Sequence, residues 1–288
     1  MECKLPDLTD EQNLRIGEIL QETKLLETEE LSPEICKIEH SKKNLVLSIT
    51  PSGQNPVVLK LFSSEKSLKN EMKIYTQLGK SDFFTSKIPT YVIYSIPKLL
   101  KTGQDYIITE FIDGINGMEL ITQQIQSPWN PALWKQVIGD LIQWVIEFSE
   151  ITKVVPLDCH IRNFILREST VYGVDFEELE DRNEESLLKL FSTLYFSILG
   201  AYPGVIEGLE LTKKADIGIL LLRRLLLSPL FQNKSIREMV PAFIEHTQNE
   251  AAAVIQRRIN FERGRGYDTK KIKENLDAVF ARIQSDFD

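Results

Sequence analysis

The order of apolar and polar positions divides the chain into a first half of strand type and a second half of helical type. Short apolar runs recur between residues 35 and 112, and turns rich in Ser, Pro, Gly and Asn separate them. Beyond residue 130, apolar residues instead recur every three or four positions over long segments, as on the buried face of an amphipathic helix. This change of period predicts two lobes with different secondary structure.

The first half is predicted to hold an antiparallel sheet, because the connections between its strands are short. Ahead of the sheet, Thr9-Asp10 suits a helix N-cap and predicts an amphipathic helix over residues 9–28. Its apolar stripe is expected to meet the chain's own core, with a partner protein as the less favoured alternative. Five strands are expected at residues 35–38, 45–49, 57–62, 97–103 and 105–112, a main helix at 63–78, and a loop-like stretch at 79–95 with a possible strand at 91–94.

The second half is predicted to be mostly helical, with helices at residues 131–152, 184–199, 212–227, 235–258 and 269–284. Trp134 and Trp144 lie in the first of these and are expected to belong to the core. The turn signal at residues 113–117 marks the lobe boundary. Its Gly114-x-x-Gly117 spacing is not expected to form a nucleotide loop, for want of a strand before it and a helix after it. The expected organisation is a helical extension over 1–34, an N-terminal lobe over 35–113 and a helical C-terminal lobe over 114–288.

Composition narrows the classes of function. Of the 288 residues, 42% are hydrophobic and 26% are charged, as in ordinary globular proteins. The net charge of −8 argues against general nucleic-acid binding, which requires clustered positive charge. Three cysteines and three histidines without paired spacing argue against a zinc site or a disulfide framework. No apolar run reaches the ~18 residues of a membrane span and the N-terminus lacks an apolar signal core, so a cytoplasmic protein without a membrane partner is expected.

Candidate chemistry lies at the ends of apolar runs in the middle of the chain. Asp158 follows Val154-Val155-Pro156-Leu157, Asn163 comes five residues later, and Asp175 comes twelve residues after Asn163. Phosphoryl transfer requires one carboxylate that orients a hydroxyl, together with an amide oxygen and a second carboxylate that hold Mg²⁺. Mg²⁺ prefers oxygen ligands, so these residues suffice together with phosphate oxygens.

A buried cation is predicted in the third strand. Lys60 lies among apolar neighbours, where an ammonium group is costly unless it pairs with a carboxylate or a phosphate. Glu71 lies beside the apolar stripe of the following helix and would by itself be interpreted as a surface glutamate. The need of Lys60 for a partner favours an ion pair between the two.

The order of these residues along the chain resembles that of the protein-kinase-like fold. Residues 158–163, Asp-Cys-His-Ile-Arg-Asn, resemble the Asp-x-His-x-x-Asn loop of the aminoglycoside phosphotransferase and choline kinase type of small-molecule kinases. Asp175-Phe176-Glu177 also resembles their version, which lacks the glycine of Asp-Phe-Gly. The resemblance covers roughly residues 35 to 200. It implies an α+β, two-lobed fold, with a five-stranded antiparallel sheet and one main helix in the N-terminal lobe and a mostly helical C-terminal lobe.

The resemblance also implies catalytic and metal-binding roles. Asp158 would orient or deprotonate the acceptor hydroxyl. Asn163 and Asp175 would ligate the Mg²⁺ that bridges the phosphates of ATP or GTP. Lys60, braced by Glu71, would contact the α- and β-phosphates.

The nucleotide is implied to contact two further parts of the N-terminal lobe. The backbone of Glu110 and Ile112, at the end of the fifth strand, would hydrogen-bond the purine. The turn Ser41-Lys42-Lys43-Asn44 stands where a phosphate-covering glycine-rich loop is expected, but it has no glycine. Either its two lysines supply charge instead, or the loop grips the nucleotide poorly.

His160 has two interpretations. It could act as a general base poised near neutral pH, or as a hydrogen-bond partner that braces the loop. Bracing is favoured, because Asp158 already fills the position of the base. Pro156 and Arg162 depart from the family pattern, which has a His and a small residue there, and they leave the catalytic set intact.

The acceptor site is predicted from the segment that follows Asp175. Residues 177–185 are rich in acids and correspond to a region that approaches the acceptor site in the family, so they would attract a cationic amine or amino sugar. A solvated turn whose acids favour the start of the next helix is the slightly preferred interpretation. The arginines at 257, 258, 263 and 265 are interpreted as a charged helix end rather than an anion site.

The sequence therefore predicts an ATP- and Mg²⁺-dependent phosphotransferase that moves the γ-phosphate to a hydroxyl of a small molecule. The acceptor would resemble an aminoglycoside, choline or a sugar, and no nucleic-acid partner is expected. Two alternatives stay open: an atypical protein kinase, which would use the same catalytic set, and a nucleotide-binding scaffold without turnover, which the glycine-free turn would suit.

Overall fold

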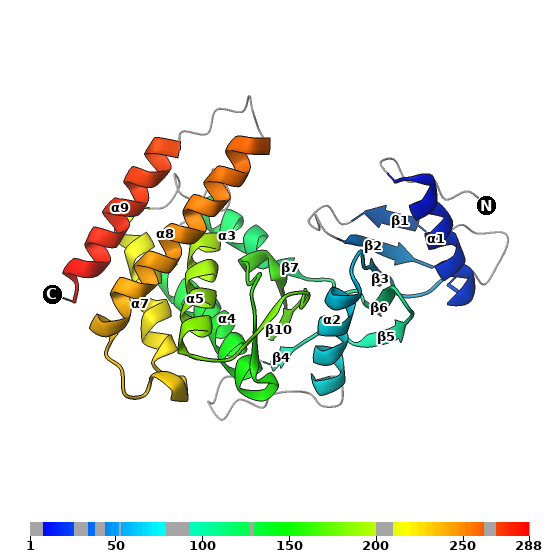
Figure 1. Ribbon diagram of the computed structural model, residues 1–288, viewed down its shortest axis with the longest axis horizontal. Coiled ribbons are helices and arrows are strands. Elements are labelled where there is room, and N and C mark those ends of the chain that lie inside the picture. Colours follow the sequence, from blue (N-terminus) through cyan, green and yellow to red (C-terminus); the bar gives the residue numbers. More distant parts are fainter. Residues whose placement is uncertain are drawn as a thin grey trace. The chain divides into compact units, whose positions relative to one another are not determined.

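The computed structural model describes residues 8–25, 34–37, 44–51, 53–78, 93–126, 130–199, 210–261 and 269–287. They form two compact units, and most of their elements are labelled in Figure 1. The first unit comprises Met1–Ser81 and Ile96–Asp113, and the second comprises Asp82–Ser95 and Gly114–Asp288. Strand β4 (Ile93–Ser95) thus belongs to the second unit, although it lies between elements of the first in sequence.

A five-stranded antiparallel sheet forms the centre of the first unit, as predicted. Its strand order is β1-β2-β3-β6-β5. One main helix, α2 (Glu65–Leu78), follows β3 directly. The strands are β1 (Glu34–Lys37), β2 (Leu45–Thr50), β3 (Val57–Leu61), β5 (Leu99–Thr102) and β6 (Tyr106–Glu110).

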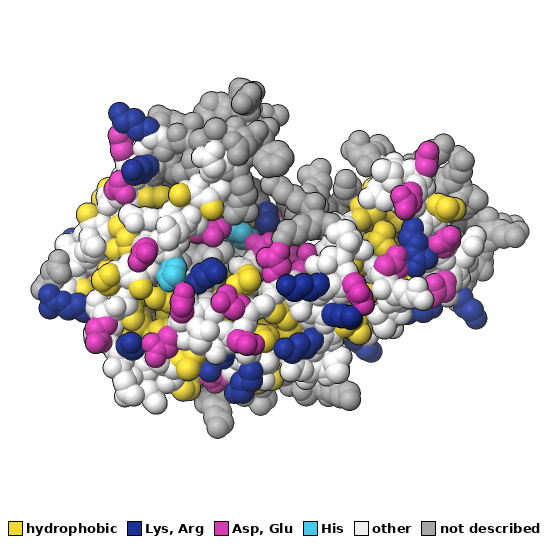
Figure 2. Space-filling model, in the orientation of Figure 1, with side chains coloured by type: hydrophobic (Ala, Val, Ile, Leu, Met, Phe, Trp, Pro, Cys, Tyr) yellow, Lys and Arg dark blue, Asp and Glu magenta, His cyan; other side chains and the backbone are white. Residues whose placement is uncertain are grey.

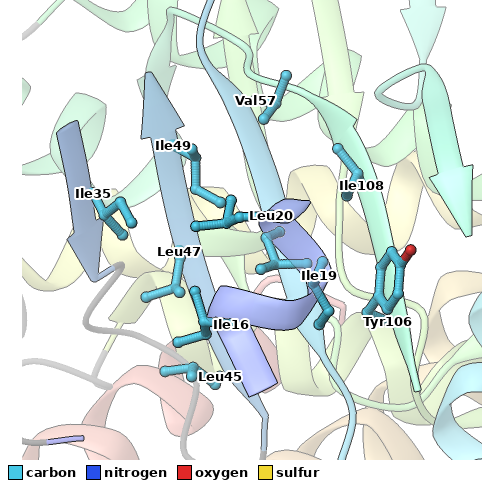
Figure 3. Packing of buried hydrophobic residues seen from close by; sticks show 11 residues of the cluster. Ile16, Ile19, Leu20, Ile35, Leu45, Leu47, Ile49, Val57, Tyr106 and Ile108 are labelled. Atoms are coloured by element: carbon cyan, nitrogen blue, oxygen red, sulfur yellow. The ribbon is translucent and has the colours of Figure 1, made fainter. Parts of the chain in front are cut away.

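Helix α1 (Asp10–Glu22) covers one face of this sheet (Figure 3). Its buried residues Ile16, Ile19 and Leu20 pack against apolar side chains of β1, β2, β3 and β6. The prediction that its apolar stripe meets the chain's own core is confirmed for these three residues, whereas Leu14, which belongs to the same stripe, is exposed. Because side chains alternate along a strand, Leu59 faces α1 and Lys60 points to the opposite face of the sheet.

The start of helix α1 was predicted correctly from the sequence, and its end was not. The predicted N-cap is present, as Thr9 and Gln12 form a reciprocal capping box. The predicted C-terminal end is wrong, because the helix stops at Glu22. Lys24 adopts a left-handed conformation with φ 56°, and the Leu25 N–H donates to the Leu20 carbonyl at 3.1 Å, which closes the helix. Glycine usually occupies that position, so the lysine in the sequence did not indicate the end of the helix. Residues 26–28 lie outside the described residues.

Helices dominate the second unit, and all five predicted ones are present. Helix α5 packs against α8, α4 packs against α7, and α9 packs against α7 and α8 (Figure 1). Among the described residues, none of the helices combines the length and the apolar character that crossing a membrane requires. The helices are α3 (Gly117–Gln126), α4 (Pro131–Thr152), α5 (Glu184–Leu199), α7 (Leu211–Leu225), α8 (Ile236–Phe261) and α9 (Thr269–Ser285).

Two small sheets in the second unit hold the segment with the candidate residues. A four-stranded sheet has the order β4-β10-β9-β7, and a two-stranded sheet pairs β11 with β8. Strand β11 contradicts the interpretation of its residues as a solvated turn, since Leu179, Glu180 and Asp181 pair with Pro156, Val155 and Val154. Besides β4, these strands are β7 (Ile115–Asn116), β8 (Val154–Pro156), β9 (Phe164–Arg167), β10 (Thr170–Gly173) and β11 (Leu179–Asp181).

The lobe-boundary glycines have a different context from the one expected. Gly117 opens a helix, α3, directly after strand β7. The expectation that this glycine spacing has no strand before it and no helix after it is therefore wrong. A Cβ at Gly117 would collide with the backbone carbonyl of Ile161, in the 3₁₀ turn η1 (Ile161–Asn163). The glycine therefore allows the start of α3 to pack directly on the loop that carries the candidate residues.

Candidate functional site

The first unit contains the predicted ion pair. The Lys60 Nζ on β3 lies 2.9 Å from the Glu71 Oε2 on α2, and the two side chains are only 9% and 3% exposed. The Lys60 ammonium also lies 5.1 Å from the centre of the Phe62 ring, within the range of a cation–π contact. The pairing is confirmed, and the contact of Lys60 with nucleotide phosphates stays a prediction.

The end of strand β6 defines which backbone groups could meet a purine. The Glu110 N–H donates to the Lys98 carbonyl at 3.0 Å, and the Lys98 N–H donates to the Glu110 carboxylate at 2.7 Å. The Glu110 N–H is thus used inside the protein, and only its carbonyl could accept from a base. Ile112 lies two residues on and is buried. Purine binding by Glu110 and Ile112 stays a prediction, and the turn residues Ser41 to Lys43 lie outside the described residues.

In the second unit, the loop after β8 closes through backbone and amide hydrogen bonds. The Asn163 Nδ2 donates to the Asp158 carbonyl at 2.7 Å, and the His160 N–H donates to the same carbonyl at 3.1 Å. The Asn163 N–H donates to the His160 carbonyl at 2.9 Å. Asp158 and Asn163 are therefore brought together, as their spacing predicted.

His160 contacts the candidate catalytic carboxylate directly. Its Nε2 lies 2.8 Å from the Asp158 Oδ1. The Asp158 side chain is 47% exposed, whereas that of His160 is only 16% exposed. This contact is what the bracing interpretation expects, and the role of His160 stays a prediction.

Asp175 lies beside Asn163 because of the register between β9 and β10. Phe164 pairs with Gly173, and the Val174 N–H donates to the Asn163 carbonyl at 2.9 Å. Asp175 then adopts a left-handed conformation with φ 72°. Such a conformation is uncommon for residues other than glycine and is found more often at functional sites. The predicted trio Asp158, Asn163 and Asp175 thus lies on one hydrogen-bonded segment.

Buried aromatic rings of this segment pack against those of helix α4. Phe176 stacks on Phe148 and Trp144 of α4, with ring centres 5.3 Å and 6.2 Å apart. Trp144 also packs edge-on against Phe164 and donates from its indole to the Ser95 carbonyl. A Cβ at Gly173 would overlap the Trp144 ring, so the glycine is needed for this close approach. Trp144 belongs to the core as predicted, while the side chain of Trp134 lies outside the described residues.

One supporting residue was not predicted from the sequence. The buried hydroxyl of Ser197 on α5 accepts a hydrogen bond from the Ile161 N–H at 2.9 Å. The only signal for it was a serine between apolar residues near the end of this helix. By contrast, burial, with a contribution from Asp158, raises the pKa of the Cys159 thiol, so this cysteine stays protonated and is not a nucleophile.

The donor atoms of Asn163 and Asp175 fit a magnesium ion. Because the Asn163 Nδ2 is engaged with the Asp158 carbonyl, its Oδ1 is the atom left to act as a ligand. Asp175 adds a carboxylate, so both groups offer the oxygen ligands that Mg²⁺ prefers. Metal binding by these residues stays a prediction.

The acidic segment after Asp175 is more ordered than expected. Glu177 is only 9% exposed, and Glu180 lies in β11 with its carboxylate 3.8 Å from the Lys189 ammonium. Glu184 and Glu185 occupy the first turn of α5, as expected for acids near a helix N-terminus. On the face drawn in Figure 2, basic and acidic side chains are interspersed. Both the cationic acceptor and the lack of a nucleic-acid partner stay predictions.

Comparisons with known proteins indicate the fold. No protein-family model matches the chain, and no curated protein matches it in sequence. Among solved structures, the chain is similar to the kinase-like protein WaaP in complex with acyl carrier protein, with a TM-score of 0.50, 14% identity, and coverage of 81% of this chain and 92% of that chain. It also matches the PknI kinase domain of Mycobacterium tuberculosis at a TM-score of 0.44 and 14% identity, over 73% of this chain and 94% of that chain. At this identity the first likeness speaks to the fold alone, and the chain has a protein-kinase-like fold.

Proposed function

We propose that the chain is a phosphotransferase that moves the γ-phosphate of ATP to a hydroxyl of a small molecule in the presence of Mg²⁺. The observation that carries the proposal is the hydrogen-bonded segment that joins Asp158, Asn163 and Asp175. It holds one accessible carboxylate and two oxygen ligands, the set that phosphoryl transfer requires.

Each residue of this segment has one task in the proposed reaction. Asp158 accepts a hydrogen bond from the acceptor hydroxyl and takes its proton as transfer proceeds. His160 holds the Asp158 carboxylate in place through its Nε2. Asn163 and Asp175 hold the magnesium ion, which when bound neutralises charge on the phosphates.

The first unit contributes a cation to the same reaction. Lys60 binds phosphate oxygens, and Glu71, whose carboxylate lies 2.9 Å from the Lys60 ammonium, holds that group in position. The carbonyl of Glu110 and the backbone of Ile112 bind the base. A small-molecule acceptor is preferred over a protein because of the Asp-x-His-x-x-Asn loop and the Glu177 that follows Asp175.

Nucleotide binding and transfer are tested in two steps with the full chain. Thermal unfolding is measured with ATP or GTP, with and without Mg²⁺; nucleotide at 100 times its Kd should add about 2.7 kcal/mol of stability. Transfer from radiolabelled ATP is then measured to aminoglycosides, choline, sugars and nucleosides, with a generic protein substrate in parallel.

The Asp158→Asn variant tests the catalytic assignment. It should keep the nucleotide-induced thermal shift and lose transfer by about 10²- to 10⁴-fold, the usual contribution of a general base. Asp181→Asn, which removes an exposed acid from the end of β11, serves as the matched control and should transfer normally. The absence of a shift with every nucleotide would contradict the proposal, and transfer to the protein substrate alone would replace it with a protein kinase.

A further inference from the structure

The paired strands β8 and β11 close the chain segment that carries the candidate residues. The Leu157 N–H donates to the Glu178 carbonyl at 2.9 Å, directly beside the ladder between the two strands. The trio of Asp158, Asn163 and Asp175 lies between these two residues along the chain. The register of β11 on β8 therefore sets how the two ends of the segment meet.

The side chains of β11 do little to fix that register. Leu179 and Glu180 are half-buried and Asp181 is exposed, so the strand has no fully buried apolar residue. A ribbon of two strands is by itself only marginally stable, and a strand without a buried apolar face can shift its register. A further contact is therefore needed to keep β11 in place.

Arg182, the residue directly after β11, makes such a contact. Its N–H extends the ladder by donating to the Lys153 carbonyl at 3.0 Å. Its Nε donates to the Ser149 hydroxyl at 3.2 Å, and its Nη2 donates to the Ser228 hydroxyl at 3.1 Å. The same Nη2 lies 3.5 Å from the Glu150 carboxylate. The Arg182 side chain is only 11% exposed, and both serines are fully buried.

The two serines lie at the ends of two helices that pack against each other. Ser149 belongs to the last turn of α4, where the carbonyl end of the helix favours a positive charge. Its hydroxyl donates to the Ile146 carbonyl at 2.8 Å, which leaves the oxygen to accept from Arg182. Ser228 follows α7, and its N–H donates to the Leu225 carbonyl at 3.0 Å. Because α4 packs against α7, the guanidinium ties β11 to the helical core of the second unit.

We propose that Arg182 is a positioning residue, which fixes the register of β11 on β8 and thereby holds Asp175 beside the loop that carries Asp158; this inference rests on the proposed function. The donors of a planar guanidinium point in fixed directions, so Arg182 meets both hydroxyls at once. A lysine has the same charge at a single point and lacks this shape. The shape of the side chain, and not its charge alone, is therefore what the ladder requires.

Hydrogen–deuterium exchange of the nucleotide-free full chain tests the register without any transfer reaction. In Arg182→Gln, the amides of residues 154–163 and 174–182 should exchange about tenfold faster or more, because hydrogen bonds from a charged group to buried hydroxyls are lost. Amides of the sheet in the first unit should keep their exchange rates. Arg182→Lys should recover only part of the protection. The matched control Arg282→Gln removes an exposed arginine that pairs with Asp286 at 3.2 Å and should leave both segments unchanged.

The transfer reaction tests the consequence of this register for the candidate site. Arg182→Gln should lower kcat by about 10²-fold, the usual cost of displacing reacting groups by about 1 Å. The Kd for ATP in the absence of Mg²⁺ should stay unchanged, because the displaced residues would hold the nucleotide through the metal ion. Arg282→Gln should leave both quantities unchanged.

The outcomes separate this inference from the proposed function. Faster exchange that is confined to the two segments supports the role of Arg182 even if no acceptor is phosphorylated. Unchanged exchange in Arg182→Gln, equal acceleration throughout both units, or a kcat equal to that of the unmodified chain would overturn it. Full recovery in Arg182→Lys would overturn it as well, because charge alone would then suffice. If Arg182→Gln does not fold, Ser228→Ala removes only one of the two acceptors and should accelerate exchange in the same two segments by a smaller factor.

Discussion

The two units hold their candidate charged residues by different means. In the first unit, Lys60 and Glu71 are buried and joined side chain to side chain at 2.9 Å. In the second unit, Asp158 is half exposed, and its loop is held by main-chain hydrogen bonds, by the Asn163 amide and by His160. A change at Lys60 therefore leaves a charge in the interior, whereas a change at Asp158 removes only an accessible group. A change at Lys60 should therefore lower the stability of the protein, whereas a change at Asp158 should lower its activity and leave its stability almost unchanged.

Breaking the buried pair is expected to have the largest effect on stability. Lys60→Met removes the ammonium that faces the Glu71 carboxylate and should lower the free energy of unfolding by about 3–5 kcal/mol. Asp158→Asn should lower it by less than about 1 kcal/mol, because the side chain is solvated and close in shape. Urea unfolding followed by circular dichroism measures both. The double variant Lys60→Met/Glu71→Leu should recover most of the stability; a double variant as unstable as the single one would show that the lost charge balance is not the cause.

The second comparison concerns two glycines with opposite surroundings. A Cβ at Gly173 would overlap the Trp144 ring, so Gly173→Ala should cost about 1–3 kcal/mol, as overpacking of a core does. Gly17 lies within α1 and has open space at the Cβ position. Gly17→Ala should therefore raise stability by about 0.5–1 kcal/mol through helix propensity. Thermal unfolding of both variants gives the two signs, and equal shifts in one direction would contradict the assigned surroundings.

The smallest expected effect is a difference in pH dependence between one carboxyl of each unit. Burial, opposed by Arg224 and by a hydrogen bond with Tyr94, raises the pKa of Asp140 from 3.8 to about 6. Its contribution to stability is complete below pH 3.8 and is lost as the pH rises through about 6. The hydrogen bond with Arg15 lowers the pKa of Asp105 in the first unit, so its contribution is present above pH 3.8 and is lost as the pH falls through the lowered pKa.

Urea unfolding between pH 3 and pH 7 tests these opposite signs. Asp140→Asn should reduce the loss of stability toward neutral pH, while Asp105→Asn should reduce the loss toward acid pH. Glu147, whose pKa burial also raises, keeps part of the first slope in the Asp140 variant. The Asp105 effect should stay below about 1 kcal/mol, because Arg15 and Asp105 are 30% and 38% exposed. Two variants with slopes that change in the same direction would contradict the assignment.

Sequence patterns predicted the elements that bury a regular apolar face. The five strands of the first sheet and the long helices of the second unit follow from their periods, because a repeated spacing of apolar residues leaves one backbone conformation that buries them. Elements without such a face were missed. Strand β7 has two residues, and β11 consists of Leu179, Glu180 and Asp181, whose backbone pairing with β8 does not depend on apolar side chains.

The sequence by itself determined which carboxylate, amide and ammonium groups are available and in what order they occur along the chain. It placed Asp158 and Asn163 on one short loop and Asp175 at the end of the next hairpin, because a short connection leaves few ways to arrange them. It also required a partner for Lys60, since an ammonium among apolar residues is costly. Glu71 is that partner.

Only the tertiary structure decided how these residues are held and what surrounds them. The left-handed conformation of Asp175, the anchoring of Phe176 on α4 and the burial of Glu177 depend on residues far away in sequence. The same is true of the support that Ser197 gives to the loop. Local preferences are set by neighbours along the chain, whereas burial and hydrogen-bond partners are set by whichever segments pack together. For that reason Glu177 and Glu178, which are identical neighbours in the sequence, differ in the folded protein. Glu177 is buried beside Asp175, and Glu178 is exposed.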